Sequence, residues 1–326
     1  MDRTGLLRDF IRKLNRVIAI AIAERTDIEE IRLRVDRPVI VRTGRGEYYV
    51  TQNGKLAKQR DNTLEEIPKE VLFLNFGEIG AMFAAINENS VYAYQEEIKR
   101  GYITIKGGHR VGIAGKTVLT GDGAINYIKD VSGLNIRVAR EVKGCSNKLL
   151  RYIVRGPKDI FNTLIVSPPG TGKTTLLRDL ARNFSNGIEV PLFQGVNVGI
   201  VDERSEIAAC YKGVPQNDVG IRSDVLDGCP KIEGMMMLLR SMSPGIIVTD
   251  EIGGDGDAEA VRRVANAGVR LLATAHGYCM DNIADLRKDA KELIKDGVFQ
   301  KIIVLDGSKG PGSVKDVIDG GKFNGA

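Results

Sequence analysis

The chain has 326 residues, 43% hydrophobic and 27% charged, which is the composition of a folded globular protein with room for about two domains. Its net charge of +5 is compatible with binding to nucleic acid or to an anionic surface, but it is too small to indicate either partner. Near the N-terminus the longest wholly apolar run, residues 17–23, is far shorter than the roughly 20 residues of a membrane span.

Residues 1–150 predict an N-terminal α+β domain with a mainly antiparallel sheet. Apolar residues at three- and four-residue spacing over 6–22 predict one amphipathic helix, which we expect to pack on its own domain rather than lie on a membrane. Alternating and glycine-rich patterns predict the remaining elements: strands at 31–35, 39–41, 48–50 and 136–140, a helix over 79–86 after the polar stretch 55–68, a tight hairpin over 102–115, and a helix over 148–154.

Residues 164–175 read Leu-Ile-Val-Ser-Pro-Pro-Gly-Thr-Gly-Lys-Thr-Thr and predict a phosphate-binding loop between a buried strand and a helix. Glycines in the loop allow its N–H groups to face one phosphate chain, above a helix N-terminus that favours anions. Lys173 is expected to reach the β- and γ-phosphates of ATP, and the Thr174 hydroxyl to bind Mg²⁺. The expected ATP-binding residues are Ser167 (where the usual motif has glycine), Pro168, Pro169, Gly170, Thr171, Gly172, Lys173, Thr174 and Thr175.

Residues 151–326 alternate between strand-like and helix-like segments, which predicts an α/β domain with a parallel sheet covered by helices on both faces. Ligands of such sheets bind at the carboxyl ends of the strands, and four expected strand ends carry polar residues. Besides the phosphate-loop strand and helix, we expect strands at 198–201, 246–249, 269–274 and 302–305, and helices at 234–240, 258–267 and 283–295.

Carboxylates follow two of these strands. Asp250 is expected to hold Mg²⁺ and Glu251 to orient or polarise the attacking water, with an acidic helix cap as the alternative. Glu203, at the end of the preceding strand, is a second candidate for facing the γ-phosphate. The alternative for Glu203 is an exposed ion pair with Arg204, worth under about 1 kcal/mol.

The chain contains two histidines. His276 ends an expected strand beside the phosphate loop, where it could sense the γ-phosphate through a hydrogen bond. His109 lies in the glycine hairpin, and we expect a structural role for it.

Four motifs occur in a fixed order at 167–174, 201–207, 239–253 and 274–277. They resemble the phosphate loop, aspartate box, acidic motif and histidine box of type II and type IV secretion ATPases. Residues 30–34, 107–115 and 135–137 resemble the stage III sporulation protein AA family of the same superfamily, so the resemblance covers nearly the whole chain.

The resemblance implies a RecA-like P-loop ATPase core behind the N-terminal domain, using ATP and Mg²⁺ and assembled with itself as a ring, expected to be a hexamer. It implies a cytoplasmic protein, peripheral at the membrane through partner proteins of a channel between forespore and mother cell.

Two positions depart from the secretion ATPases: Asp250 stands where they often have Gly, and Gly253 where they usually have Arg. The superfamily also brings arginines from a neighbouring subunit's N-terminal domain to the ATP site. Arg110, Arg137 and Arg140 are the candidates here for that catalytic role.

Other nucleotide-binding classes fit less well. The sequence has no Asn-Lys-x-Asp base reader of a GTPase and no Ser-Gly-Gly signature of an ABC-type ATPase. A RecA-like nucleic-acid translocase and an ATP-gated scaffold with negligible turnover remain the alternatives. With 6% aromatic residues and no Trp, the chain offers little for base stacking, so nucleic acid is not an expected partner. The presence of Glu251, the residue expected to orient the attacking water, favours an active ATPase over the scaffold.

Overall fold

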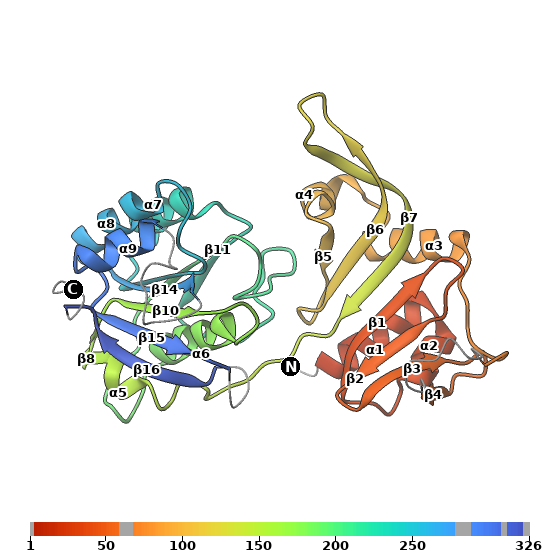
Figure 1. The fold of residues 1–326 in the computed structure, drawn as a ribbon, viewed down its shortest axis with the longest axis horizontal. Helices are drawn as coiled ribbons and strands as arrows, with labels where there is room; N and C mark the ends of the chain where they lie inside the picture. The colour runs from red at the N-terminus through yellow and green to blue at the C-terminus, as the bar shows by residue number, and fades with distance from the viewer. Residues whose placement is uncertain (1–2, 59–67, 278–287, 308–311, 322–326) are drawn as a thin grey trace. The chain divides into compact units, whose positions relative to one another are not determined.

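The computed structural model describes residues 3–58, 68–277, 288–307 and 312–321 (Figure 1). Part of the expected loop at 55–68 and the first five residues of the helix expected at 283–295 lie outside the described residues. The chain divides into two units, Met1–Arg140 and Glu141–Ala326, so the division falls ten residues before the boundary expected from the sequence.

The first unit is a seven-stranded antiparallel sheet with helices. Its strand order is β4-β3-β2-β1-β7-β6-β5. The elements are α1 (Arg3–Leu14), α2 (Arg16–Ala21), β1 (Ile28–Arg34), β2 (Ile40–Thr43), β3 (Gly46–Val50), β4 (Leu56–Lys58), α3 (Phe76–Ile86), the 3-10 turn Tyr92–Tyr94, α4 (Gln95–Lys99), β5 (Tyr102–Thr104), β6 (Arg110–Leu119) and β7 (Ile125–Arg137).

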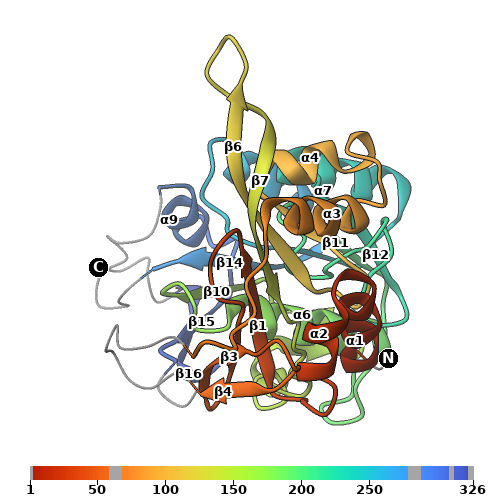
Figure 2. The same ribbon diagram turned by 90° about the vertical axis from the view of Figure 1, so that its right-hand side faces the viewer.

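One face of this sheet carries the core of the first unit. Figures 1 and 2 show α1, α2 and α3 on the same side of the strands, and their apolar side chains form one buried cluster with alternate strand residues such as Ile31, Leu33 and Ile136. This agrees with the expected antiparallel sheet, which has one face in the core and one toward solvent.

Two local expectations for the first unit were wrong. The helix expected over 6–22 is two helices, because Asn15 has an extended backbone (φ −154°) and its side chain accepts hydrogen bonds from the N–H groups of Val17 (2.9 Å) and Ile18 (3.1 Å). An N-cap of this kind starts a new helix. The strand expected at 136–140 is the end of the much longer β7, which stops at Arg137 and so excludes Arg140.

The second unit contains a seven-stranded sheet in the order β12-β11-β13-β14-β10-β15-β16. All neighbouring pairs are parallel except β15 with β16. Its elements are α5 (Leu150–Ile153), β8 (Val154–Gly156), β9 (Asp159–Ile160), β10 (Thr163–Ser167), α6 (Lys173–Asn186), β11 (Val198–Asp202), β12 (Ser223–Asp227), α7 (Lys231–Ser241), β13 (Ile246–Thr249), α8 (Asp257–Asn266), β14 (Arg270–His276), α9 (Lys288–Lys295), β15 (Lys301–Leu305) and β16 (Val314–Asp319).

Helices cover both faces of this sheet. Ile165 of β10 packs in a buried cluster with α6, whereas its neighbours Leu164 and Val166 pack in a second cluster with α7, α8 and α9. Burial on both faces explains why the strands read as continuous apolar runs. The sequence did not indicate β12 or β16, whose residues are only partly apolar.

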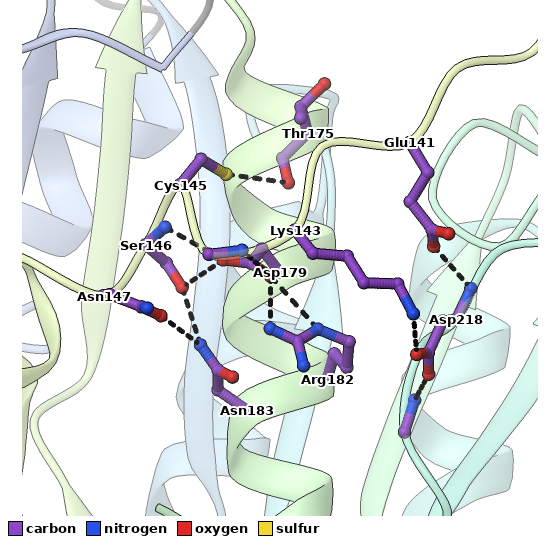
Figure 3. Close-up of polar contacts among 12 residues, drawn as sticks. Glu141, Lys143, Cys145, Ser146, Asn147, Thr175, Asp179, Arg182, Asn183 and Asp218 are labelled. Atoms are coloured by element: carbon purple, nitrogen blue, oxygen red, sulfur yellow. Dashed lines mark hydrogen bonds and ion pairs between the residues drawn. The ribbon is translucent and has the colours of Figure 1, made fainter. Parts of the chain in front are cut away.

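The segment that follows the division is attached to α6 (Figure 3). The Asp179 carboxylate accepts hydrogen bonds from the backbone N–H groups of Gly144 (3.0 Å) and Ser146 (2.9 Å) and from the Ser146 hydroxyl (2.7 Å). Lys143 pairs with Asp218, whose own N–H donates to the side chain of Glu141 (2.8 Å). These contacts place residues 141–147 with the second unit.

Across the described residues, no helix is both long enough and apolar enough to span a membrane.

Candidate nucleotide site

The predicted phosphate loop joins β10 to α6. Gly170 and Gly172 have positive φ angles of 77° and 96°, a region that favours glycine, and Gly172 is the N-cap residue of α6. The Ser167 hydroxyl hydrogen-bonds with that of Thr171, which also donates to the Pro168 carbonyl (2.9 Å). Serine at the position of the usual glycine therefore helps to close the loop.

Lys173, the first residue of α6, points back into the loop. Its Nζ donates to the carbonyl oxygens of Ser167 (3.0 Å) and Pro168 (3.1 Å) and lies 3.1 Å from Nδ1 of His276. Burial lowers the pKa of Lys173, against the opposing charge of Glu251. The ammonium group is thus a buried point charge enclosed by the loop, where the β- and γ-phosphates of ATP are expected.

The strand order brings the other candidate site residues to the same edge of the sheet as the phosphate loop. The parallel strands β11, β13, β14 and β10 are successive neighbours, with Ser167 opposite His276. Nε2 of His276 is 2.9 Å from Oε1 of Glu251, and Oε2 of Glu251 is 2.7 Å from a guanidinium nitrogen of Arg204. A continuous polar chain therefore runs from Lys173 through His276 and Glu251 to Arg204.

Glu251 is held in an unusual conformation. Its φ is 47°, which is uncommon for a residue other than glycine, and its N–H donates to the Thr274 hydroxyl (2.8 Å). Burial raises the pKa of this carboxyl group, but the hydrogen bond with His276 and the charge of Arg204 outweigh burial, and the pKa is lowered overall. Glu251 is therefore a carboxylate with a fixed orientation.

Asp250 has the opposite electrostatic environment. It is buried, and burial together with the charges of Asp202, Glu206 and Glu251 raises its pKa to about 7. A divalent cation would offset this accumulated negative charge, so Asp250 fits the expected Mg²⁺ ligand. No cluster of three or more His, Cys, Asp or Glu able to hold a metal occurs in the described part of the chain.

Glu203, the second carboxylate candidate, contacts the start of α7. Its carboxylate pairs with Lys231 (2.8 Å), at the start of α7, and Lys231 also lies 4.0 Å from Asp257. The preceding Asp202 is fully buried and accepts hydrogen bonds from the N–H groups of Glu206 (2.7 Å) and Ala208 (2.8 Å), so it shapes the turn after β11.

The candidate arginines belong to the first unit, whereas the phosphate loop belongs to the second. Arg140 donates to the Asp27 carbonyl (2.8 Å) and pairs with Glu29 (3.3 Å). Arg137 is exposed at the end of β7. The guanidinium of Arg110 stacks 4.5 Å from the ring centroid of Tyr102.

His109 is fully buried, and its ring nitrogens contact the N–H of Ala139 (3.1 Å) and the carbonyl of Arg3 (3.2 Å). Burial lowers its pKa to about 4, which keeps the ring neutral. These contacts support the structural role expected for His109.

Sequence reasoning missed Arg204 as a partner of Glu251. Arg204 directly follows Asp202 and Glu203 at a strand end, and we expected it only as an exposed partner of Glu203. Arg204 contacts Glu251 because β11 and β13 are neighbours in the sheet. The amino-acid sequence does not reveal this strand pairing.

Comparison with known proteins supports the same fold and identifies relatives. A profile of the family described as "Sporulation stage III, protein AA" matches residues 2–322. Stage III sporulation protein AA of Bacillus subtilis (strain 168) is 42% identical over 296 residues, covering 90% of this chain and 87% of that protein.

Two solved structures share the fold. The ATPase DotB of Legionella pneumophila has a TM-score of 0.50 and 13% identity, covering 92% of this chain and 75% of that one. The pilus retraction motor PilT has a TM-score of 0.51 and 14% identity, covering 85% and 74%. This confirms the predicted RecA-like P-loop core with an N-terminal α+β domain. With a family profile matched from end to end and a Bacillus relative of such identity, the chain belongs to the stage III sporulation protein AA family.

Proposed function

We propose that the protein is the ATP-hydrolysing motor of a secretion-type transport apparatus that acts during sporulation. The observation that carries this proposal is the polar chain from Lys173 to Glu251, which joins a phosphate loop to a carboxylate at adjacent strand ends. A scaffold that only binds ATP would not need an oriented carboxylate at this place.

We assign a role in ATP hydrolysis to each residue of this polar chain and to the groups beside it. Loop N–H groups and Lys173 bind the phosphates of ATP, and Glu251 orients the attacking water and accepts its proton. His276 contacts both Lys173 and Glu251, so it connects phosphate binding to the position of the carboxylate. Thr174 and Asp250 would hold Mg²⁺, which neutralises charge on the phosphates.

We also propose a ring of identical subunits, expected to be a hexamer, working with membrane proteins of a channel between forespore and mother cell. The protein would then be cytoplasmic and peripheral at the membrane. Membership in a sporulation family and a fold shared with secretion ATPases support this part of the proposal.

Two substitutions test the enzymatic proposal. Lys173→Ala should abolish ATP binding because it removes the positive charge that contacts the phosphates. Glu251→Gln should still bind ATP but lose turnover. Binding of a fluorescent ATP analogue and release of phosphate with Mg²⁺ measure the two steps. Arg263→Ala, on the exposed face of α8, is the matched control and should behave as wild type.

Wild-type turnover in Glu251→Gln would contradict the role of Glu251 and transfer it to Glu203. Normal ATP binding with no turnover in the wild-type ring would favour the scaffold.

A further inference from the structure

The solvent-facing side of the first unit's sheet combines arginines with very small residues. On the central strands β1, β7 and β6, Arg32 lies opposite Asn135, which lies opposite Gly112. One step along the same face, Arg34 lies opposite Gly133, which lies opposite Ala114. Alternate residues of the same strands point into the helix-covered core, so these residues are on the face without helices.

This face contains a cavity of about 300 Å³, lined among others by Arg32, Arg34, Gly112, Ala114, Gly133 and Asn135. Gly112 has no positive φ, and a Cβ added to it would meet only Asn135 atoms at 3.7 and 3.8 Å, an ordinary contact distance. Neither backbone conformation nor crowding therefore demands glycine at this position. The effect of glycine here is to keep the cavity open.

Two polar atoms of cavity-lining side chains have no hydrogen-bond partner among the described residues: Nε of Arg34 and Oδ1 of Asn135, both shielded from solvent. The neighbouring Arg32 differs, because its guanidinium pairs with Glu30. Buried donors and acceptors are normally satisfied, since leaving them unpaired costs free energy. Because these two atoms are closed off from solvent, they do not border the open cavity themselves. The cavity presents the Arg34 side chain, which has no ion-pair partner among the described residues, and a guanidinium without a carboxylate partner indicates a site for an anion.

We propose that this cavity binds a small oxyanion, a phosphate or carboxylate group held by Arg34. The planar guanidinium matches both kinds of anion through paired N–H donors. The volume is at the lower end of small-molecule sites, which fits a compact metabolite better than a polymer. The site is separate from the phosphate loop and does not depend on the proposed ATPase activity.

The test uses the full chain with Lys173→Ala, so that the phosphate loop contributes little to anion binding. Inorganic phosphate and citrate are titrated separately by calorimetry at constant ionic strength. Arg34→Gln, added to this background, should weaken binding at least tenfold, and Gly112→Leu should abolish it by filling the cavity. Arg42→Gln, an exposed arginine on β2, is the matched control and should change affinity less than twofold.

Absence of binding by either anion would overturn the proposal, as would equal affinity in Arg34→Gln and its parent. Far-UV circular dichroism checks that each variant is folded, and Arg34→Lys gives a second variant that keeps the charge but loses the paired donors. Loss of assembly in Arg34→Gln and Gly112→Leu, seen by sedimentation without any anion binding, would mean that a second copy covers this face instead.

Discussion

Glu251 is oriented by three contacts, two from the end of β14 and one from the turn after β11. His276 and Arg204 hold its two carboxylate oxygens, and Thr274 accepts its N–H. Because a cation beside a carboxylate favours the charged form, these contacts keep Glu251 ionised although it is partly buried. The same contacts also make it a weaker base, so Arg204 influences both the position and the proton affinity of the proposed catalytic group.

Arg204→Ala should move the acid limb of the pH dependence of kcat to higher pH. Removing the nearby positive charge raises the pKa of Glu251, so a larger fraction is protonated, and inactive, at a given acidic pH. Turnover measured from about pH 3 to 9 at saturating ATP gives this profile, because the lowered pKa of Glu251 places the wild-type limb below the ordinary range of a glutamate. Arg204→Lys should restore most of the original profile, and an unchanged limb in Arg204→Ala would show that Arg204 does not act on Glu251.

At the level of elements, the segment 141–147 is hydrogen-bonded to Asp179 of α6, the helix that begins at the phosphate loop (Figure 3). Asp179 is almost fully buried and is also bonded by Arg182 of the same helix (2.7 Å). Burial raises the pKa of Asp179, but the hydrogen bonds from Ser146, Arg182 and Gly144 together lower it. The charged carboxylate is thus the form that holds the segment in place.

Asp179→Ala should lower the free energy of unfolding of the second unit by about 2–4 kcal/mol, because it leaves several buried donors without an acceptor. Urea unfolding measures this loss, and limited proteolysis should cut residues 141–147 faster. The control is Asp218→Ala, which removes a more exposed pair with Lys143 and should cost under about 1 kcal/mol. Equal losses in the two variants would contradict the anchoring role of Asp179.

At the level of the whole molecule, the proposed ring requires an arginine from one subunit at the ATP site of another. Both arginines are exposed, but Arg140 pairs with Glu29 and donates to the Asp27 carbonyl of its own unit, whereas the side chain of Arg137 makes no hydrogen bond or ion pair with the described residues. Arg137 is therefore the stronger candidate for action in trans, although both were expected from the sequence.

Turnover per subunit should rise steeply with protein concentration as subunits associate. An arginine supplied by a neighbouring subunit increases the turnover rate about 10³- to 10⁵-fold. Neither Lys173→Ala nor the double variant Arg137→Ala, Arg140→Ala should be active alone, but a mixture should recover activity, because one supplies the arginine and the other the phosphate loop. Constant specific activity on dilution, with no recovery on mixing, would mean that each subunit completes its own site.

Local patterns were sufficient for most features that one continuous stretch of chain creates. The phosphate loop could be predicted because strand, glycines, lysine and helix N-terminus follow each other within twelve residues. The placement of Asp250, Glu251 and His276 near the phosphate loop could be predicted because parallel strands place their carboxyl ends at one edge of the sheet. The helix break at Asn15 was missed because apolar spacing continues across it and hides the capping signal.

Features that join distant parts of the chain needed the fold. The ion pairs Arg204–Glu251 and Lys231–Glu203 and the attachment of residues 141–147 to Asp179 link residues 28 to 47 positions apart. Strand order and helix packing determine these contacts, and many pairings of charged residues agree equally well with the same sequence. The cavity beside Arg34 is a still clearer case, because strands separated by about one hundred residues bring its arginine, asparagine and glycine together on one face.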